Sequence, residues 1–231
     1  MISPLNNYFD KVYLLNLHKR KDRLSTSIKK LNQFNIDVEI FGATDGSVMD
    51  HIWSKLDNSN FTNSKYLACA ISHLSIYADA IQNKHDRILI IEDDCKINTK
   101  INEIFTDIPN WKDLLYLGYI PLSEDLTMWN YGMIDNRIDN KFFISNNLWG
   151  LYAYGISSSL MSELIDTYNQ FFPMELDRYF VNVIQKRGNS IGISPQLFCC
   201  EDGYSDNSGV FEANMSLKSI DSRYASQNDF I

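Results

Sequence analysis

A run of four branched aliphatic residues leads straight into three consecutive acids, which leaves the chain few ways to fold. Residues 88–91 are wholly apolar, and the acids that follow are Glu92, Asp93 and Asp94. A short apolar run of this kind is typical of a strand that is buried on both faces of a sheet. Adjacent carboxylates repel one another and are costly to bury. We therefore expect the acids at the end of a buried strand, in contact with water, a cation or both.

Two interpretations of this acidic triplet are open on the segment alone. The carboxyl ends of buried strands are where α/β proteins bind ligands. A divalent cation at such an end would neutralise the acids and could hold a diphosphate on its far side. The alternative is a solvated acidic turn that follows the strand and binds nothing.

Further strands and helices are predicted on both sides of this strand. Apolar runs predict strands at 12–17, 38–41, 114–117, 149–156 and 190–194. Helical spacing of apolar residues covers 24–31, 67–81, 101–108, 160–168 and 176–184, the last ended by Gly188. Residues 47–63 and 119–148 and the tail from 203 lack periodicity, and 57–60 are expected to form a loop tip. We expect Asp22 to cap the first helix, Asn35 to end it, and Asn63 or Ser64 to cap the second.

The order of these elements predicts the fold class. Alternating strands and helices in the first half are typical of an α/β protein whose central, mainly parallel sheet is flanked by helices on both faces. A chain of 231 residues fits one large domain. We therefore expect a single domain over residues 1–231.

Charge and cysteine content exclude some classes of function. The formal net charge of −8 argues against nucleic-acid binding, which needs a basic surface. The four cysteines follow no metal-binding or disulfide spacing, so we expect reduced thiols and a cytoplasmic protein. The N-terminus carries no basic start followed by an apolar run, and no stretch of about 18 uninterrupted apolar residues is present. Membrane association is expected to be peripheral at most.

Six short motifs follow one another in the order found in glycosyltransferase family 25, which this chain resembles. That family includes bacterial lipopolysaccharide galactosyltransferases and collagen glycosyltransferases, and its motifs here span residues 12 to about 206. They are Val12–Leu17 with Lys19–Arg23, Ala43-Thr44-Asp45-Gly46, Cys69-Ala70-Ile71-Ser72-His73, Ile90–Asp94, Tyr152–Ser157 and Ser205-Asp206.

The resemblance implies a GT-A-like fold and a metal-dependent transferase. Such an enzyme would move a hexose from UDP-galactose or UDP-glucose to a hydroxyl of a glycan, a lipid-linked sugar or a protein. Mn²⁺ or Mg²⁺ would stabilise the charge of the departing UDP. The nucleotide-binding part would cover about 8–118 and the acceptor-side part about 119–231.

The same resemblance assigns roles to individual residues. Asp93, Asp94 and Asp206 are expected to bind the metal, with Glu201 and Asp202 as rivals of Asp206. Donor contacts are expected from Asn16, Arg20, Arg23, Asp45, Ser72, His73, Glu92 and Asp93. By analogy with inverting transferases, Asp177 or Glu175 would take the proton from the acceptor hydroxyl, with Asp177 preferred.

Each assignment has a plainer alternative. His73 could be a satisfied core histidine, Asp177 a helix-start acid and Trp149 either a sugar platform or a packing residue. As a whole, the chain could be a nucleotide-sugar-binding or glycan-binding module without turnover. The acids could also serve a metal-dependent phosphoesterase.

Overall fold

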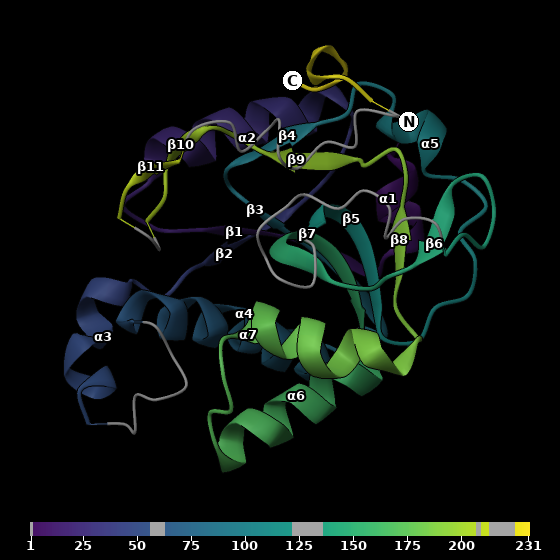
Figure 1. Cartoon of the computed structure of the whole chain (residues 1–231). Helices are drawn as coiled ribbons and strands as arrows, with labels where there is room; N and C mark the ends of the chain where they lie inside the picture. Colours follow the sequence, from purple (N-terminus) through teal and green to yellow (C-terminus); the bar gives the residue numbers. More distant parts are fainter. Residues whose placement is uncertain (1, 56–62, 122–135, 207–208, 213–224) are drawn as a thin grey trace.

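A central sheet lies between two layers of helices (Figure 1). The structure is a computed structural model that describes residues 2–55, 63–121, 136–206, 209–212 and 225–231. The seven strands of the sheet are β1 Lys11–Asn16, β2 Glu39–Gly42, β3 Arg87–Glu92, β5 Leu114–Pro121, β6 Phe142–Ile144, β7 Leu148–Ser157 and β8 Ile191–Ile193. The α-helices are α1 Pro4–Tyr8, α2 Lys21–Gln33, α3 Gly46–Trp53, α4 Ser64–Gln82, α5 Ile101–Ile104, α6 Ser158–Gln170 and α7 Leu176–Tyr179.

The strands follow the order β2-β1-β3-β7-β5-β8-β6, which places β3 near the middle of the sheet. The pairings make β2, β1, β3, β5 and β8 run one way, while β7 and β6 run the other. The predicted α/β class with a mainly parallel sheet is therefore confirmed. The reversal of β7 has a topological cause. Leu148 at its start pairs with Pro121 at the end of β5, so β7 begins where β5 finishes and runs back antiparallel to it.

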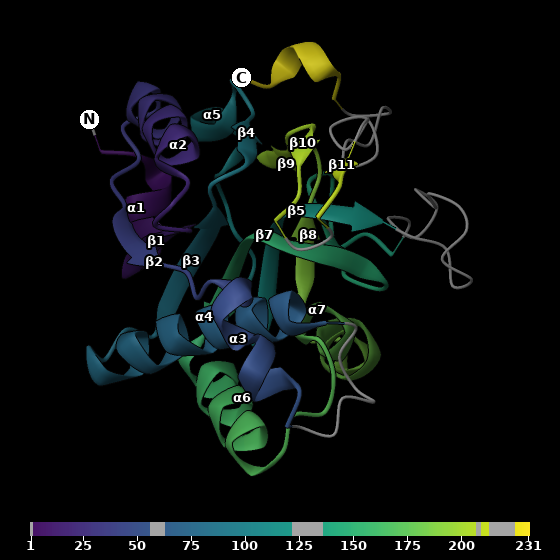
Figure 2. The ribbon, with the colours of Figure 1, turned by 90° about the vertical axis from the view of Figure 1, so that its left-hand side faces the viewer.

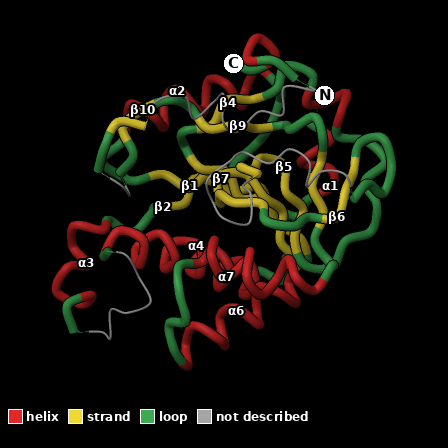
Figure 3. The backbone as a smooth tube through the Cα atoms, in the orientation of Figure 1, coloured by secondary structure: helices red, strands yellow, loops and turns green. Residues whose placement is uncertain are grey.

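Apolar residues on both faces of the sheet explain the two helical layers, which Figure 3 shows in red on either side of the yellow strands. In β3, Ile88 and Ile90 pack on the side of α4 and α6. Leu89 and Ile91 face the side of α1, α2 and α5. All four side chains are at most 2% exposed. The expectation of a strand buried on both faces is thus confirmed.

Helix α4 is the longest of the described helices, and its start is capped as the sequence predicts. The side chain of Asn63 accepts hydrogen bonds from the backbone N–H groups of Lys65 and Tyr66. The helix predicted from residue 176 also forms, but it continues from α7 as a π-helical segment, η3 Phe180–Ile184, and a 3-10 turn, η4 Gln185–Arg187. Gly188 ends it with a φ of 72°, a conformation that favours glycine.

Some predicted helix boundaries are wrong. Helix α2 begins at Lys21, so its cap position is Arg20 and not Asp22. Asp22 lies in the first turn instead, where a carboxylate is favoured by the helix dipole. Residues 47–53, expected to be irregular, belong to α3. Only eight residues long, this helix gives too short a sequence pattern to reveal its period. Helix α5 stops at Ile104, four residues earlier than expected.

Short strands that the sequence does not predict also form. Strand β4 Cys95–Ile97 follows the acids directly and pairs with β9 Phe198–Cys200. A small hairpin, β10 Gly203–Tyr204 with β11 Phe211–Glu212, comes next in the chain. Strands of two or three residues carry no readable alternation. Figure 2 shows β4, β9 and this hairpin together above the sheet, on the side of α5.

The C-terminus returns to β4. Ile97 and Ile231 exchange two backbone hydrogen bonds, of 2.9 and 3.0 Å, and a 3-10 turn, η5 Gln227–Asp229, precedes that contact. The loop tip predicted at 57–60 and residues 122–135 of the excursion predicted within 119–148 lie outside the described residues. The single-domain assignment and its division near residue 118 stay predictions. None of the helices in the described ranges combines the length and apolar character that crossing a bilayer requires.

Candidate functional site

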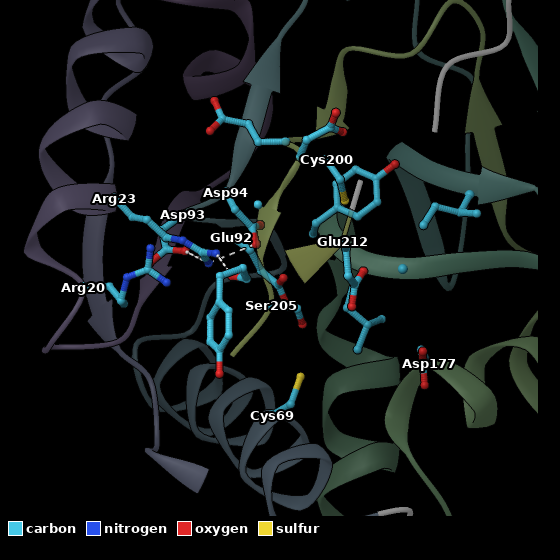
Figure 4. Close-up of a pocket in the computed structure, with 18 of the residues that line it drawn as sticks. Arg20, Arg23, Cys69, Glu92, Asp93, Asp94, Asp177, Cys200, Ser205 and Glu212 are labelled. Atoms are coloured by element: carbon cyan, nitrogen blue, oxygen red, sulfur yellow. Dashed lines mark hydrogen bonds and ion pairs between the residues drawn. The ribbon is translucent and has the colours of Figure 1, made fainter. Parts of the chain in front are cut away.

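The acidic triplet lies at the carboxyl end of β3, where two cavities meet. Their volumes are about 460 and 320 Å³. Both are lined by the three acids, Arg23 and Cys69; the larger also reaches Asp177 and the smaller reaches Asp45. Figure 4 shows the larger cavity, with the acids and Arg23 on one side and Asp177 across from them. The acids therefore face a cleft, which disfavours the solvated-turn interpretation.

Segments that are distant in the sequence meet around the acids in this cleft. Strands β1 and β3 are parallel neighbours, so Asn16 at the end of β1 and the start of α2 lie beside the acids. The β4–β9 pair then brings the distant C-terminal part of the chain back, since the Glu201 backbone N–H donates to the Asp94 carbonyl over 2.8 Å. This return carries Asp206 to the cleft.

Two arginines from the start of α2 bind the acids. Arg23 Nη1 lies 3.3 Å from Asp93 Oδ1 and 3.1 Å from Asp94 Oδ2. It is also 3.9 Å from Asp206 Oδ2, to which Arg20 Nη1 donates over 2.7 Å. The structure therefore brings together Asp93, Asp94 and Asp206, as the predicted metal set requires. Their partners here are guanidinium groups.

Asp93 is held on three sides. Its side chain accepts from Asn16 Nδ2 and from Arg23, and its backbone carbonyl accepts from Ser27 Oγ over 2.7 Å. Burial raises the pKa of Asp93, although Asn16 and Arg23 act to lower it. Asn16 is 3% exposed, so its amide serves to fix this carboxylate and leaves little surface for a donor.

Asp94 has the features of a cation ligand. Its Oδ1 atom is buried and finds no hydrogen-bond partner among the described residues. Burial, together with the charge of Glu92, raises the pKa of Asp94 to about 7. Burial is the main cause of this shift, and the negative charges of Glu92 and Asp93 add to it, while Arg23 opposes it. A hard divalent cation, which prefers several carboxylate oxygens, fits these residues.

Glu92 is oriented by a buried hydrogen-bond chain. Its Oε1 atom lies 3.2 Å from His73 Nε2, and His73 Nδ1 lies 2.8 Å from the Tyr154 hydroxyl. The Tyr154 hydroxyl also pairs with that of Tyr77. His73 is 0% exposed, so it cannot touch a donor unless the site rearranges. His73 is therefore a satisfied core histidine, as in the plainer interpretation, and it also orients Glu92.

The smaller cavity contains two further predicted donor residues. Ser72 Oγ accepts from the Thr44 backbone N–H over 2.8 Å and donates to the Ala68 carbonyl. That hydroxyl thus ties the loop after β2 to α4. Asp45 receives Lys19 Nζ at 2.8 Å, and this contact lowers the pKa of Asp45 to about 2.

Asp177, the predicted base, lines the larger cavity from α7. Its side chain accepts from the Arg178 backbone N–H over 2.7 Å, and burial raises its pKa. Its rival Glu175 lines the same cavity and pairs with Arg178 at 3.3 Å. Trp149 does not line either of the two cavities; its ring N–H donates to Asn147.

Several site residues escaped the sequence reasoning. Ser27 and Lys30 lie one turn apart on α2; Ser27 binds Asp93 and Lys30 pairs with Glu201. Burial lowers the pKa of Lys30. The sequence marks Tyr154 only as part of a strand motif. Ser27 lies beside the apolar stripe of α2, four residues before Leu31, so a polar residue next to a buried stripe is the available signal for it.

The comparisons with known proteins agree with the sequence motifs. A sequence model described as glycosyltransferase family 25 (LPS biosynthesis protein) matches residues 9–180. Procollagen galactosyltransferase 2 of Mus musculus is 27% identical over 130 residues, which cover 48% of this chain and 21% of that protein. The inactive glycosyltransferase 25 family member 3 of Mus musculus is 26% identical over 129 residues, covering 48% and 22%. The matched segment is thus about a fifth of each relative's length.

Among solved structures, the crystal structure of a glycosyltransferase involved in the glycosylation of the major capsid of PBCV-1 is similar. Its sequence identity is 12% and its TM-score is 0.46, over 86% of this chain and 96% of that one.

Proposed function

Because the chain belongs to glycosyltransferase family 25, we propose that it transfers a hexose from a UDP-sugar to an acceptor hydroxyl. The acceptor would belong to a glycan, a lipid-linked sugar or a protein. One observation carries this proposal: the acids at the end of β3 lie where two cavities join. We propose that the smaller cavity holds the nucleotide and the larger one the two sugars, with the reacting bond beside the acids.

We propose a GT-A-type enzyme that depends on Mn²⁺ or Mg²⁺. Asp94, Asp93 and Asp206 would hold the cation, since the buried Asp94 Oδ1 lacks a partner in the described part of the chain. When bound, the cation supplies positive charge for the diphosphate of the leaving UDP. Asn16 and Ser27 would keep Asp93 in place throughout.

Arg20 and Arg23 give the site further positive charge. Both guanidinium groups line the larger cavity, and in the structure they form ion pairs with the aspartates. A guanidinium group binds phosphate oxygens well because its N–H groups form a fixed fork. We propose that the arginines also contact the diphosphate when the cation takes over the carboxylates.

The remaining groups divide between donor and acceptor. Glu92, oriented by His73, would accept hydrogen bonds from the ribose hydroxyls, and the loop at Asp45 would border the base or ribose in the smaller cavity. Asp177, across the larger cavity, would take the proton of the acceptor hydroxyl in an inverting displacement. Burial raises its pKa, which makes it a stronger base than an exposed aspartate.

Galactose or glucose is the hexose that we propose. The mouse relative is named a procollagen galactosyltransferase, which supports galactose first. We also propose a cytoplasmic location, with at most peripheral membrane association. All four cysteines lie in the described ranges and none forms a disulfide, which supports a reducing compartment.

A screen of UDP release across UDP-hexoses tests the proposal. We expect release from UDP-galactose or UDP-glucose that requires Mn²⁺ and rises when an acceptor is added. Metal-independent UDP binding without any release of UDP from UDP-sugars would instead indicate a binding module. One relative of this chain is itself named an inactive family member. Turnover of simple phosphate esters would indicate a phosphoesterase. Either result would overturn the assignment.

A further inference from the structure

A thiol, an imidazole and a carboxylate converge beside the acid cluster. Cys69 Sγ, a ring nitrogen of His73 and a carboxylate oxygen of Glu92 all lie within 4.8 Å of one another. Cys69 and His73 are one helical turn apart on α4, so both project from the same face. Glu92 comes from the end of β3, and Figure 4 shows the Cys69 sulfur pointing from α4 toward the acids.

The chemistry of these three groups differs from that of the neighbouring aspartates. Thiolate and imidazole are ligands for Zn²⁺ and similar borderline cations, whereas Mn²⁺ and Mg²⁺ favour carboxylate oxygens. Zn²⁺ binds sulfur at about 2.3 Å and imidazole nitrogen at about 2.0 Å. Ligand atoms within 4.8 Å of one another need only a small closing movement to reach such distances.

The surroundings of His73 complete the arrangement. Its Nδ1 atom lies 2.8 Å from the Tyr154 hydroxyl, which can accept the Nδ1–H. With the Nδ1–H donated to Tyr154, Nε2, which lies 3.2 Å from Glu92 Oε1, would carry the lone pair that a cation binds in place of the hydrogen bond to Glu92. Histidines that ligate metals commonly donate their second ring N–H to such a partner, which fixes the tautomer and the ring orientation.

We propose that Cys69, His73 and Glu92 form a second cation site, selective for Zn²⁺ over Mn²⁺. The cation would displace the Cys69 thiol proton and take a place between Nε2 and the Glu92 carboxylate, with the proton released to solvent. Cys69 lines both cavities, so the fourth coordination position opens to the cleft. This is the pattern of three protein ligands and one exchangeable position.

Occupancy of this site would affect the donor, a consequence that rests on the proposed function. Glu92 is the residue proposed to bind the ribose. Zn²⁺ would hold its carboxylate against α4, so we expect Zn²⁺ to weaken UDP binding while Mn²⁺ at the aspartates strengthens it. The binding of Zn²⁺ itself does not depend on any transferase activity.

Titration of the reduced full chain with Co²⁺, a spectroscopic substitute for Zn²⁺, tests the site without nucleotide. We expect one equivalent to give a thiolate-to-cobalt charge-transfer band that Zn²⁺ abolishes and Mn²⁺ does not. Cys69→Ser should remove the band, and Cys200→Ser, which alters another cysteine of the larger cavity, should keep it. Tyr154→Phe should weaken Co²⁺ binding by roughly 10-fold or more. No band in the wild type, or a band that survives in Cys69→Ser, would overturn the proposal.

Thiol labelling of the unmodified chain gives a second measurement if Cys69→Ser fails to fold. Zn²⁺ should slow alkylation of Cys69 strongly and leave that of Cys200 unchanged, with both sites mapped by mass spectrometry. Equal alkylation of Cys69 with and without Zn²⁺ would refute the site. Because neither measurement involves UDP, its outcome is independent of whether the chain transfers sugar.

Discussion

Each carboxylate of the triplet has a different neighbour, and this difference separates their roles. Glu92 faces His73, Asp93 is fixed by Asn16 and Arg23, and Asp94 keeps one buried oxygen without a partner in the described residues. Desolvation and mutual repulsion raise the pKa of both aspartates. A bound cation would relieve that repulsion, which is why these residues favour a metal site over a solvated turn.

Substitutions of two tyrosines in β7 test the buried hydrogen-bond chain that orients Glu92. Tyr154→Phe removes a hydroxyl that bonds to both His73 and Tyr77, and both partners are buried. We expect it to lower the free energy of unfolding by about 1–3 kcal/mol. Tyr152→Phe is the matched control. Its hydroxyl is buried without a hydrogen-bond partner in the described part of the chain, so its loss should be neutral or stabilising. Equal costs in denaturant titrations would contradict the account.

The pH dependence of transfer tests Asp177. A general base must be ionised, and burial raises the pKa of Asp177 above its ordinary value of 3.8. We therefore expect kcat/KM to fall as the pH drops through this raised pKa, at a higher pH than an exposed aspartate would give. Asp177→Asn should cost about 10²–10⁴-fold in kcat and abolish that limb.

Asp166→Asn, which changes an exposed aspartate on α6, is the control for Asp177 and should leave the profile unchanged. If Asp177→Asn has the wild-type pH profile of kcat/KM, Asp177 is not the general base. A loss confined to Glu175→Gln would move the role of the base to Glu175.

At the scale of elements, the site is built from the ends of parallel strands. Strands β2, β1 and β3 are neighbours that run the same way, so the segments that follow them all begin at the same end of the sheet. Helix α4 packs against the sheet near this end and contributes Cys69, Ser72 and His73 from one face. The hydrogen bond between Ser72 and Thr44 ties the loop after β2 to that helix.

Two serines of α4 allow the effect of the Ser72–Thr44 hydrogen bond to be distinguished from the effect of replacing any serine in this helix. Both Ser72 and Ser75 donate to the carbonyl four residues earlier, but only Ser72 also binds another segment. We expect Ser72→Ala to cost about 1–3 kcal/mol of unfolding free energy, because it leaves the Thr44 N–H without its acceptor, and to weaken UDP binding. Ser75→Ala, on the exposed side, should be close to neutral. If the two substitutions change stability and UDP affinity to a similar extent, the role assigned to the Ser72–Thr44 hydrogen bond is contradicted.

The sequence predicts the elements that carry long apolar patterns and misses those that do not. The strand before Glu92 and helix α4 follow from burial and spacing, because each repeats its pattern over a whole element. Helix α3 and strands β4 and β9 are too short to show a period. The contacts of Asp93 and Asp94 with Arg23 depend on the pairing of distant segments, which local patterns do not encode.

On the scale of the whole molecule, the chain closes over its own site. β4 leaves the acids, pairs with β9 and so returns residues 201–206 to the start of α2, more than a hundred residues away in sequence. The formal net charge of −8 makes the molecule repel a diphosphate overall. Positive charge at this one place, from arginines and a cation, is therefore what a UDP-sugar needs in order to bind.

Calorimetry with UDP, with and without Mn²⁺, tests this central claim most directly. For the wild type we predict that Mn²⁺ strengthens UDP binding, and that Asp94→Asn removes the enhancement, at least about tenfold in affinity, while the chain stays folded. Asp107→Asn, which changes an aspartate that is 91% exposed, is the control and should bind as the wild type does. Mn²⁺-enhanced binding that persists unchanged in Asp94→Asn would contradict the account.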